Sequence, residues 1–358
     1  TERLIKVLQN LRDLGNTVIV VEHDEDIMKA ADRIIDIGPE AGSHGGQLVA
    51  EGSFAELLEA DSLTANYLSG KLEIPVPKKR RKSNNYIEIK GARENNLQNI
   101  DVTFPLESLT VITGVSGSGK STLVKKILFP AMQKKLEGVG DKAGQFSELS
   151  GSFSHIKHIE YVDQNPIGRS SRSNPVTYIK AYDDIRDLYA KEKLSKVRGY
   201  QAKHFSFNVD GGRCETCKGE GSINVEMVFM ADVSLPCDTC GGKRFKKEVL
   251  EVTFEGKNID DILSMTIDDA IAFFQNHKQT KIIQKLQPLQ DVGLGYVQLG
   301  QSSSTLSGGE AQRIKLASFL VKGVTKEKAL FVFDEPTTGL HFHDIKKLLA
   351  SFDALIEK

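Results

Sequence analysis

A glycine-rich loop set between an apolar run and an amphipathic segment restricts the fold of this chain more than any other feature. The residues VITGVSGSGKSTL fit the pattern G-x-x-x-x-G-K-S over positions 114–121. Glycines allow backbone N–H groups to surround a phosphate, and the N-terminus of a following helix adds partial positive charge. The pattern therefore predicts a strand over 109–113, a phosphate-binding loop, and a helix that begins near Lys120. A simple glycine-rich turn is the alternative.

The loop pattern gives chemical roles to two side chains. Lys120 is expected to reach the β- and γ-phosphates of a nucleotide, and Ser121 is expected to ligate Mg²⁺. The predicted nucleotide-binding residues of the loop are Gly114, Val115, Ser116, Gly117, Ser118, Gly119, Lys120, Ser121 and Thr122.

The run ALFVFDEPTTGLH over 329–341 supplies two adjacent carboxylates. A buried strand over 330–333 would deliver them at its C-terminal end, where ligands bind in open α/β sheets. Asp334 is expected to hold Mg²⁺ through water, and Glu335 to polarise the water that attacks a phosphate. Carboxylates that only cap the following turn are the alternative.

Four cysteines form the pattern C-x₂-C-x₁₉-C-x₂-C, at Cys214, Cys217, Cys237 and Cys240. This spacing is typical of a structural zinc site with four thiolate ligands. Glycines after both pairs suit tight turns that direct N–H groups at sulfur, and the residues over 224–230 alternate as in a strand. The zinc ion is therefore expected to hold the base of a projecting hairpin or loop. Two disulfides are the alternative, which the lack of a signal peptide disfavours.

Basic residues gather around the cysteines and near position 170. The predicted DNA-contacting set is Arg169, Arg172, Arg213, Lys243 and Arg244. Cations beside aromatic residues can bind a nucleic-acid backbone. An ordinary solvated surface is the alternative.

Composition adds only broad limits. The length of 358 residues suggests about two domains, and the net charge of −1 means that any nucleic-acid binding must come from local patches. No segment approaches the ~18–20 apolar residues of a membrane span. A chain that starts at Thr1 in a helical pattern is expected to be a piece of a longer polypeptide.

The first forty residues predict a helix over 1–14, a strand over 18–21, a helix over 24–31 and a strand over 33–37, followed by a hairpin. The helical spacing of 344–358 repeats that of 1–14, which indicates two related domains; two unrelated amphipathic helices are the alternative. The segment EIPVPKKRRKSNN, with five consecutive basic residues, predicts a linker. Nuclear localisation or DNA contact is the alternative for that segment.

A second helix start carries the sequence SGGE, and it decides the class of nucleotide-binding protein. Ser307, Gly308, Gly309 and Glu310 would present free N–H groups to an anion, but they lie about 190 residues after the phosphate-binding loop. They resemble the signature of the ABC ATPase superfamily, which closes in trans over a nucleotide held by a second domain. That resemblance implies Gln164 as the Q-loop glutamine. It also implies His23 as the switch histidine of an upstream domain; a purely structural histidine is the alternative.

The whole set of motifs resembles the UvrA family of bacterial DNA-repair ATPases. The resemblance covers essentially the whole chain and rests on GARENNLQNIDVTFP, DQNPIGRSSRSNPVTY, FSFNVDGGRCETCKGEG, PCDTCGGKRF, DVGLGYVQLGQSSSTLSGGEAQRIKLA and DEPTTGLHFHDI, besides the motifs above. It implies an α/β fold: an ABC-type P-loop ATPase lobe with a mostly helical signature lobe that carries a structural zinc module. It also implies ATP, Mg²⁺ and Zn²⁺ as cofactors, damaged double-stranded DNA and UvrB as partners, a homodimer of the intact protein, a cytoplasmic location and no membrane contact.

The resemblance suggests five regions. They are the end of an upstream ABC domain (1–70), a linker (71–85), the P-loop and Q-loop part of a second ABC domain (86–165), a signature domain with a zinc module at about 205–250 (166–320), and a truncated Walker B and D-loop part (321–358).

This chain also departs from the family pattern. The family's first phosphate loop, first signature, UvrB-docking insertion and first zinc site are absent, and its second switch histidine would lie beyond Lys358. Because an ABC site is composite, this chain alone is expected to bind nucleotide weakly and to hydrolyse it slowly or not at all. Two rival interpretations are a nucleotide-binding subunit of a membrane transporter and a zinc-dependent adaptor with a degenerate nucleotide site.

Overall fold

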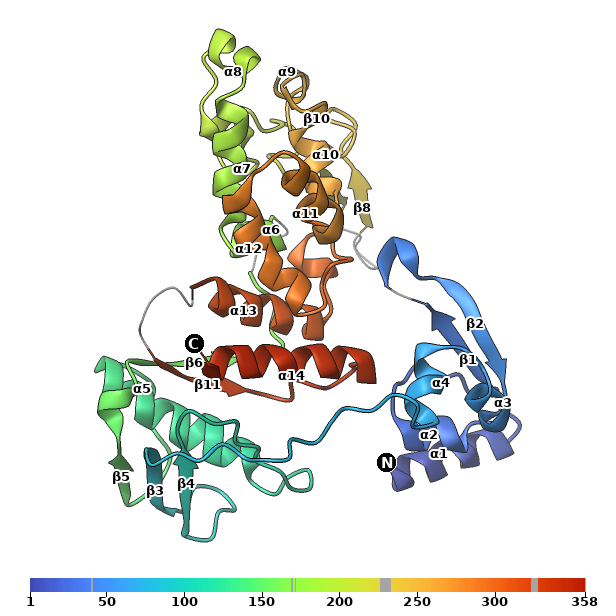
Figure 1. Cartoon of the computed structure of the whole chain (residues 1–358), viewed down its shortest axis with the longest axis vertical. Coiled ribbons are helices and arrows are strands. Elements are labelled where there is room, and N and C mark those ends of the chain that lie inside the picture. Colours follow the sequence, from blue (N-terminus) through green and yellow to red (C-terminus); the bar gives the residue numbers. More distant parts are fainter. Residues whose placement is uncertain (40, 169, 171, 226–232, 323–327, 358) are drawn as a thin grey trace. The chain divides into compact units, whose positions relative to one another are not determined.

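A computed structural model describes residues 1–39, 41–168, 170, 172–225, 233–322 and 328–357 of the chain (Figure 1). Its residues group into two compact units. Unit 1 comprises Thr1–Glu73, Asn165–Val321 and Gly339–Leu348, and unit 2 comprises Ile74–Gln164, Lys322–Thr338 and Leu349–Lys358. Helix α14 (Phe342–Glu357) is shared between them.

The N-terminal part of unit 1 combines short helices with a hairpin. Its elements are α1 (Glu2–Asp13), α2 (Glu25–Ala30), β1 (Ile34–Gly38), η1 (Gly42–His44), β2 (Gln47–Gly52), α3 (Phe54–Leu58) and α4 (Leu63–Leu68). The side chain of Asp24 caps α2 by accepting hydrogen bonds from the amides of Asp26 and Ile27. Strands β1 and β2 pair antiparallel, which confirms the predicted hairpin.

The predicted strand over 18–21 is wrong. These residues carry no strand assignment, and Ile19 and Val21 are 87% and 91% exposed. A strand exists only when its N–H and C=O groups pair with a neighbour. Among the strand pairs that the structure describes, none includes this segment, so its apolar β-branched pattern has no sheet to join.

The second part of unit 1 is mostly helical. Its helices are α6 (Pro175–Tyr178), α7 (Ala181–Ala190), α8 (Lys193–Arg198), η4 (Ala202–Phe205), α9 (Lys247–Leu250), α10 (Ile259–Ser264), α11 (Ile267–Asn276), α12 (Thr280–Asp291), η5 (Ser303–Thr305) and α13 (Gly308–Lys322). The apolar faces of α11 and α12 supply fully buried residues such as Phe274 and Leu286. The side chain of Thr266 caps α11 by accepting from the amide of Asp269.

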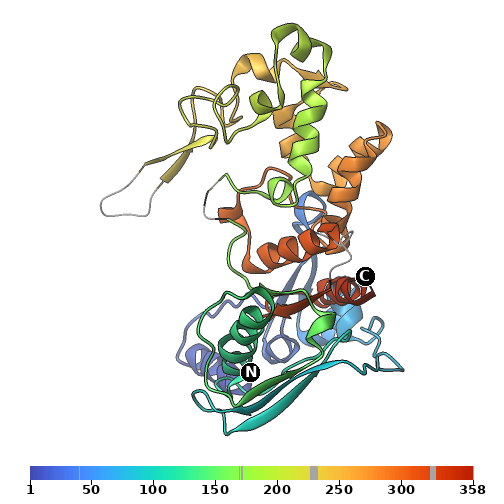
Figure 2. The same cartoon turned by 90° about the vertical axis from the view of Figure 1, so that its left-hand side faces the viewer.

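Two small antiparallel pairs accompany these helices. They are β7 (Ser222–Val225) with β8 (Val233–Pro236), and β9 (Thr253–Phe254) with β10 (Lys257–Asn258). The yellow β7–β8 ribbon projects away from the helices of the same unit (Figure 2). The predicted strand over 224–230 is confirmed for its first two residues, and residues 226–230 lie outside the described part of the chain.

Unit 2 is built on two sheets. An antiparallel sheet has the order β4 (Ile100–Pro105), β3 (Tyr86–Ala92), β5 (Glu148–Gly151), and a parallel pair consists of β6 (His158–Val162) and β11 (Ala329–Phe333). The other elements are η2 (Thr122–Leu128), α5 (Phe129–Glu137) and η3 (Phe153–His155). Ile87, Ile127 and Val332 belong to one buried core, which joins the helix after the glycine-rich loop to both sheets.

The predicted strand over 330–333 is confirmed by β11, whereas the predicted strand over 109–113 is wrong. The latter segment is unassigned, and Val111 is 75% exposed. The ladders described for unit 2 place no strand beside it, so its backbone lacks the neighbour that a strand requires. The predicted helix after Lys120 is present, although its first part, η2, is wound as a π-helix.

The basic segment before β3 is attached to the last helix. The guanidinium group of Arg81 donates hydrogen bonds to Asp353 (3.3 Å) and Glu357 (3.1 Å), which lie one turn apart on α14. None of the described helices is both long and apolar enough to cross a bilayer.

Candidate functional site

The parallel pair β6–β11 brings the predicted Q-loop and Walker B residues together. The register pairs Phe333 with Val162, and the amide of Asp334 donates to the carbonyl of Val162 (3.1 Å). Immediately beyond the two strands, Nε2 of Gln164 donates to the carbonyl oxygen of Glu335 (3.1 Å). Glu335 itself has a left-handed backbone, with φ of 47°. Asp334, Glu335 and Gln164 therefore all lie at the C-terminal end of the pair.

A residue outside the predicted set contacts Asp334. The hydroxyl of Tyr161, on β6, donates to Oδ2 of Asp334 across 2.7 Å. Burial, together with this carboxylate, raises the pKa of Tyr161 above its ordinary value, so the phenol stays protonated and acts as a donor.

The glycine-rich loop is closed by its own lysine. Nζ of Lys120 donates to the carbonyl oxygens of Gly114 (2.9 Å) and Val115 (3.0 Å). Gly119 has a φ of +106°, and a Cβ added there would come within 2.9 Å of the Leu97 side chain, so the position requires glycine. The ammonium group is thus already directed into the loop where a phosphate would compete with these two carbonyls.

The helix that follows the glycine-rich loop connects the loop to β11, the strand that precedes the predicted Walker B residues. Leu123 and Ile127 of η2 share the buried core with Val332 of β11. Nζ of Lys125 lies 5.4 Å from the centroid of the Tyr161 ring, above its face. These contacts place the helix directly against the tyrosine that bonds Asp334.

The signature residues form a capping box at the start of α13. Ser307 donates its amide to Oε2 of Glu310 (2.8 Å), and the amide of Glu310 donates to the Ser307 hydroxyl (3.2 Å). The other carboxylate oxygen of Glu310 accepts from the hydroxyl of Tyr296 (2.6 Å). Ser307 is exposed, and Gly308 and Gly309 form the first turn. Contact of these residues with a nucleotide in trans stays a prediction.

His23 lies beside a second histidine in unit 1. Its exposed ring is 6.1 Å from the ring of His341, edge to face. Nε2 of His341 is 3.3 Å from the hydroxyl of Thr64, which donates to Asp36 (2.9 Å). Nδ1 of His341 accepts from the amide of His343 (3.2 Å), and burial lowers the pKa of His341. The neutral tautomer with its proton on Nε2 satisfies both contacts.

The four cysteines form a compact cluster of free thiols. Their sulfur atoms all lie within 4.8 Å of one another, with 4.0 Å between those of Cys214 and Cys237 and 3.7 Å between those of Cys217 and Cys240. Tetrahedral Zn–S bonds of about 2.3 Å require sulfur separations of about 3.8 Å. The donor set and its dimensions fit zinc, whereas a disulfide would need about 2.05 Å.

Backbone donors around the sulfur atoms favour thiolates. The amide of Gly221 donates to the Cys217 sulfur (3.3 Å). Hydrogen bonds from the backbone at Cys240 lower the pKa of Cys237 to about 7, whereas burial raises the pKa of Cys240 to about 12. A divalent cation would stabilise the thiolate form of all four ligands.

The predicted DNA-contacting residues have different surroundings. Arg169 lies outside the described residues. Lys243 is exposed, and the guanidinium of Arg244 lies over the Phe207 ring (5.6 Å to the centroid). Arg172 and Arg213 both line a cavity of about 440 Å³ beside the cysteine cluster, with Cys217 and Lys218 among the other lining residues.

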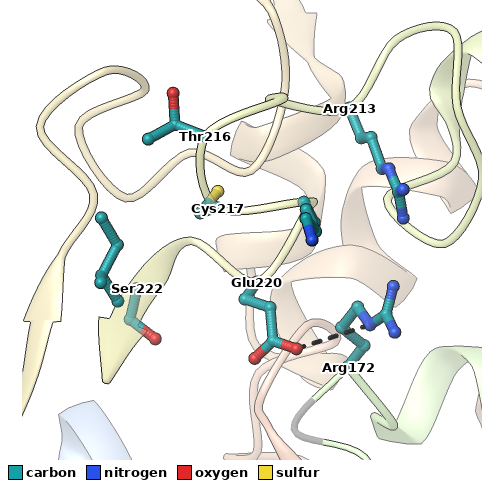
Figure 3. A pocket seen from close by; sticks show the side chains of 8 residues that line it. Arg172, Arg213, Thr216, Cys217, Glu220 and Ser222 are labelled. Carbon is teal, nitrogen blue, oxygen red and sulfur yellow. Dashed lines mark ion pairs between the residues drawn. The ribbon is translucent and has the colours of Figure 1, made fainter. Parts of the chain in front are cut away.

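The cavity is basic on one side (Figure 3). Nε of Arg172 is 3.7 Å from Oε1 of Glu220 and is buried without a hydrogen-bond partner in the described part of the chain. Arg213 is paired with Asp210 (2.7 Å). Arg172 also lines a second cavity, of about 250 Å³, with Ser170, Ser173, Thr177 and Asn208. Guanidinium, hydroxyl and amide donors around an unsatisfied N–H suit an anionic oxygen.

Sequence reasoning missed Tyr161, His341, Tyr296 and Lys218. Tyr161 lies opposite Val332 in the parallel pair, and the pattern of neither strand alone shows this register. Tyr296 and His341 contact partners far away in the sequence, so no local pattern indicates them.

Comparisons with known proteins found related sequences and a related structure. No family model matches the chain. The chain is 55% identical over 358 residues to UvrABC system protein A of Bacillus subtilis (strain 168), covering 99% of this chain and 37% of that protein. The same protein of Clostridium acetobutylicum is 54% identical, with 38% of its length covered. The crystal structure of UvrA2 from Deinococcus radiodurans matches with a TM-score of 0.91 at 44% identity, covering 100% of this chain and 42% of that one. The chain thus spans little more than a third of the length of the curated relatives.

Proposed function

Because this chain belongs to the UvrA family over its whole length, we propose that it supplies an ATP-binding ABC domain and a zinc-stabilised DNA-binding region to nucleotide excision repair. The single observation that carries the proposal is the match to UvrA sequences at 52–55% identity over 99% of the chain. The transporter alternative has no support among these relatives and is not proposed.

The proposed nucleotide site lies in unit 2. Lys120 and the amides of its loop bind the β- and γ-phosphates, while Ser121 and Asp334 hold Mg²⁺, which neutralises phosphate charge. Glu335 polarises the attacking water, and Gln164 links this edge of the site to β6. Ser307 and the two signature glycines act in trans, and His23 serves a second site that is completed by other residues. What supports these roles is the arrangement of Gln164, Asp334 and Glu335 beyond the β6–β11 pair.

The proposed DNA-binding region lies in unit 1. The zinc ion held by the four thiolates fixes the base of the β7–β8 ribbon, and Arg172, Arg213 and Lys218 bind backbone phosphates at the adjacent cavity. Glu220 is 3.7 Å from Arg172. A phosphate that binds the Arg172 guanidinium would therefore replace this weak ion pair and not only water. Damaged duplex DNA, UvrB and a second copy of the protein are the proposed partners, and the cytoplasm is the proposed location.

Salt-dependent binding of damaged and undamaged duplexes tests the DNA-binding proposal. We expect Arg172→Ala/Arg213→Ala to weaken binding and to reduce the slope of log K against log salt by about 1.8, since each neutralised phosphate contributes about 0.9. Arg3→Ala/Arg33→Ala removes the same charge from another surface of unit 1 and should leave the slope unchanged. Equal slopes for the wild type and both double variants would contradict the proposed DNA surface.

A further inference from the structure

Tyr161 is held in a fixed position between the helix after the phosphate-binding loop and the Walker B strand. Its ring packs edge to face against Phe129 (5.3 Å between centroids), and the ammonium of Lys125 lies above it. Lys125 and Phe129 are four residues apart and therefore share one face of the helical segment η2–α5. The ring also packs against the buried core of unit 2. Its hydroxyl is thus aimed by contacts on more than one side.

Strand register explains why this hydroxyl reaches Asp334. Tyr161 lies opposite Val332 in the parallel pair, and side chains two residues apart in a strand point to the same side. Asp334 follows Val332 by two residues, so its carboxylate returns to the side of the sheet that Tyr161 occupies. The resulting hydrogen bond is 2.7 Å long and ends on Oδ2.

We propose that Tyr161 is a positioning residue for Mg²⁺-nucleotide binding, because it fixes the orientation of the Asp334 carboxylate before the cation arrives. A short hydrogen bond to an ionised acceptor is among the stronger polar contacts in proteins and restricts rotation of the carboxylate. Mg²⁺ demands near-ideal octahedral geometry, so the carboxylate that would hold one of its coordinated waters must be correctly oriented. Residues that orient a metal ligand typically change metal affinity 10- to 100-fold when they are replaced.

The inference rests on the proposed nucleotide site but makes a separate statement about it. Loop residues such as Lys120 contact phosphate directly, and they would act with or without the cation. Tyr161 contacts neither phosphate nor cation in this proposal, and its effect passes only through Asp334. Its contribution should therefore be confined to the magnesium dependence of nucleotide binding.

Tyr161→Phe tests this role because it removes only the hydroxyl and keeps the ring that packs against Phe129. ATP affinity is measured by calorimetry on the 358-residue chain over a magnesium titration and again in EDTA. We expect the variant to need about tenfold more Mg²⁺ for half-maximal effect, with unchanged affinity in EDTA. Tyr86→Phe, which removes the hydroxyl of an exposed tyrosine on β3, is the matched control and should behave as wild type.

A double-mutant cycle with Asp334→Asn separates positioning from general packing. If Tyr161 acts through the carboxylate, Tyr161→Phe does not change the magnesium requirement any further in the Asp334→Asn background. Two results for Tyr161→Phe would overturn the proposal while leaving the nucleotide site intact. One is an equal loss of ATP affinity with and without magnesium, and the other is an unchanged magnesium requirement. A wild-type chain that binds no ATP would instead overturn the proposed function, and the role of Tyr161 with it.

Discussion

The side chain of Gln164 reaches from the end of β6 to the end of β11, where its Nε2 donates to the backbone carbonyl of Glu335 across 3.1 Å. The left-handed backbone of Glu335 turns the chain away from the strand at this point. The amide of Asp334 is bonded to Val162 just before it. The Asp334 backbone bond and the Gln164 side-chain bond therefore both join the two strand ends.

Replacing Gln164 by Met keeps the length of the side chain but removes its donor. Loss of a neutral hydrogen bond costs about 1 kcal/mol, which corresponds to about fivefold faster local opening. We expect the Asp334 amide to exchange with solvent about fivefold faster, as measured by NMR hydrogen exchange. Gln145→Met, at an exposed position, is the control. Unchanged exchange in Gln164→Met would show that the contact does not hold the strand ends together.

Lys120→Ala should reduce ATP affinity by about 10- to 100-fold, because hydrogen bonds to charged groups contribute about 1.5–3 kcal/mol. Calorimetric titration of the 358-residue chain measures this change. Lys126→Ala removes an exposed lysine from the same helical segment and should retain wild-type affinity. Similar losses in both variants would mean that the effect is one of overall charge and not of the loop.

The purified chain should contain a single zinc ion held by the four-cysteine cluster. Cys237→Ser removes a fully buried ligand and should lower the zinc content and the midpoint of thermal unfolding, since metal binding at such a site is coupled to folding. Elemental analysis and calorimetry measure the two effects. Ser234→Ala, on β8, is the control and should keep both values. A metal-free wild-type chain with four reactive thiols would contradict the site.

The partly buried position of His341 predicts lower stability in mild acid. Burial holds its pKa below the ordinary value of 6.5; the nearby His23 and His343 also lower it, whereas Asp344 and Asp36 raise it. The unfolded chain therefore binds the proton more readily, so this contribution is present above about pH 6.5 and is lost as the pH falls further. His341→Asn retains an acceptor for the His343 amide but does not titrate.

We expect the thermal midpoint of the wild type to fall between about pH 7.5 and about pH 5.5, and His341→Asn to reduce that fall. His155→Asn, at an exposed histidine of unit 2, should not change it. Identical pH profiles for the wild type and His341→Asn would show that the histidine makes no such contribution.

Local patterns predicted two kinds of element. They are those that pair with a neighbour close in the sequence and those that are themselves strongly apolar. Helix α1, the β1–β2 hairpin and strand β11 all follow their hydrophobic periods. The segments 18–21 and 109–113 have equally apolar patterns but are not strands, because strand formation depends on a neighbour that the pattern of one segment cannot reveal.

The sequence likewise predicted some features of the candidate site and left others ambiguous. The cysteine spacing predicted a cluster that the structure confirms as geometrically fit for a metal ion. Contact of Glu310 with a nucleotide in trans stays a prediction, and in this chain its carboxylate bonds Ser307 and Tyr296. The order S-x-x-E is also that of a capping box, so the sequence already contained this second interpretation.

Because ion pairs attach Arg81 to α14, the ionic strength should determine how firmly the segment before β3 is held. Asp353 and Glu357 keep 64% and 67% of their side-chain surface exposed, so dissolved ions can weaken both pairs. In dilute buffer Arg81 holds the basic segment to the last helix at one point. In concentrated salt the basic segment should detach from α14 and become more extended, while the apolar core of unit 2 stays folded.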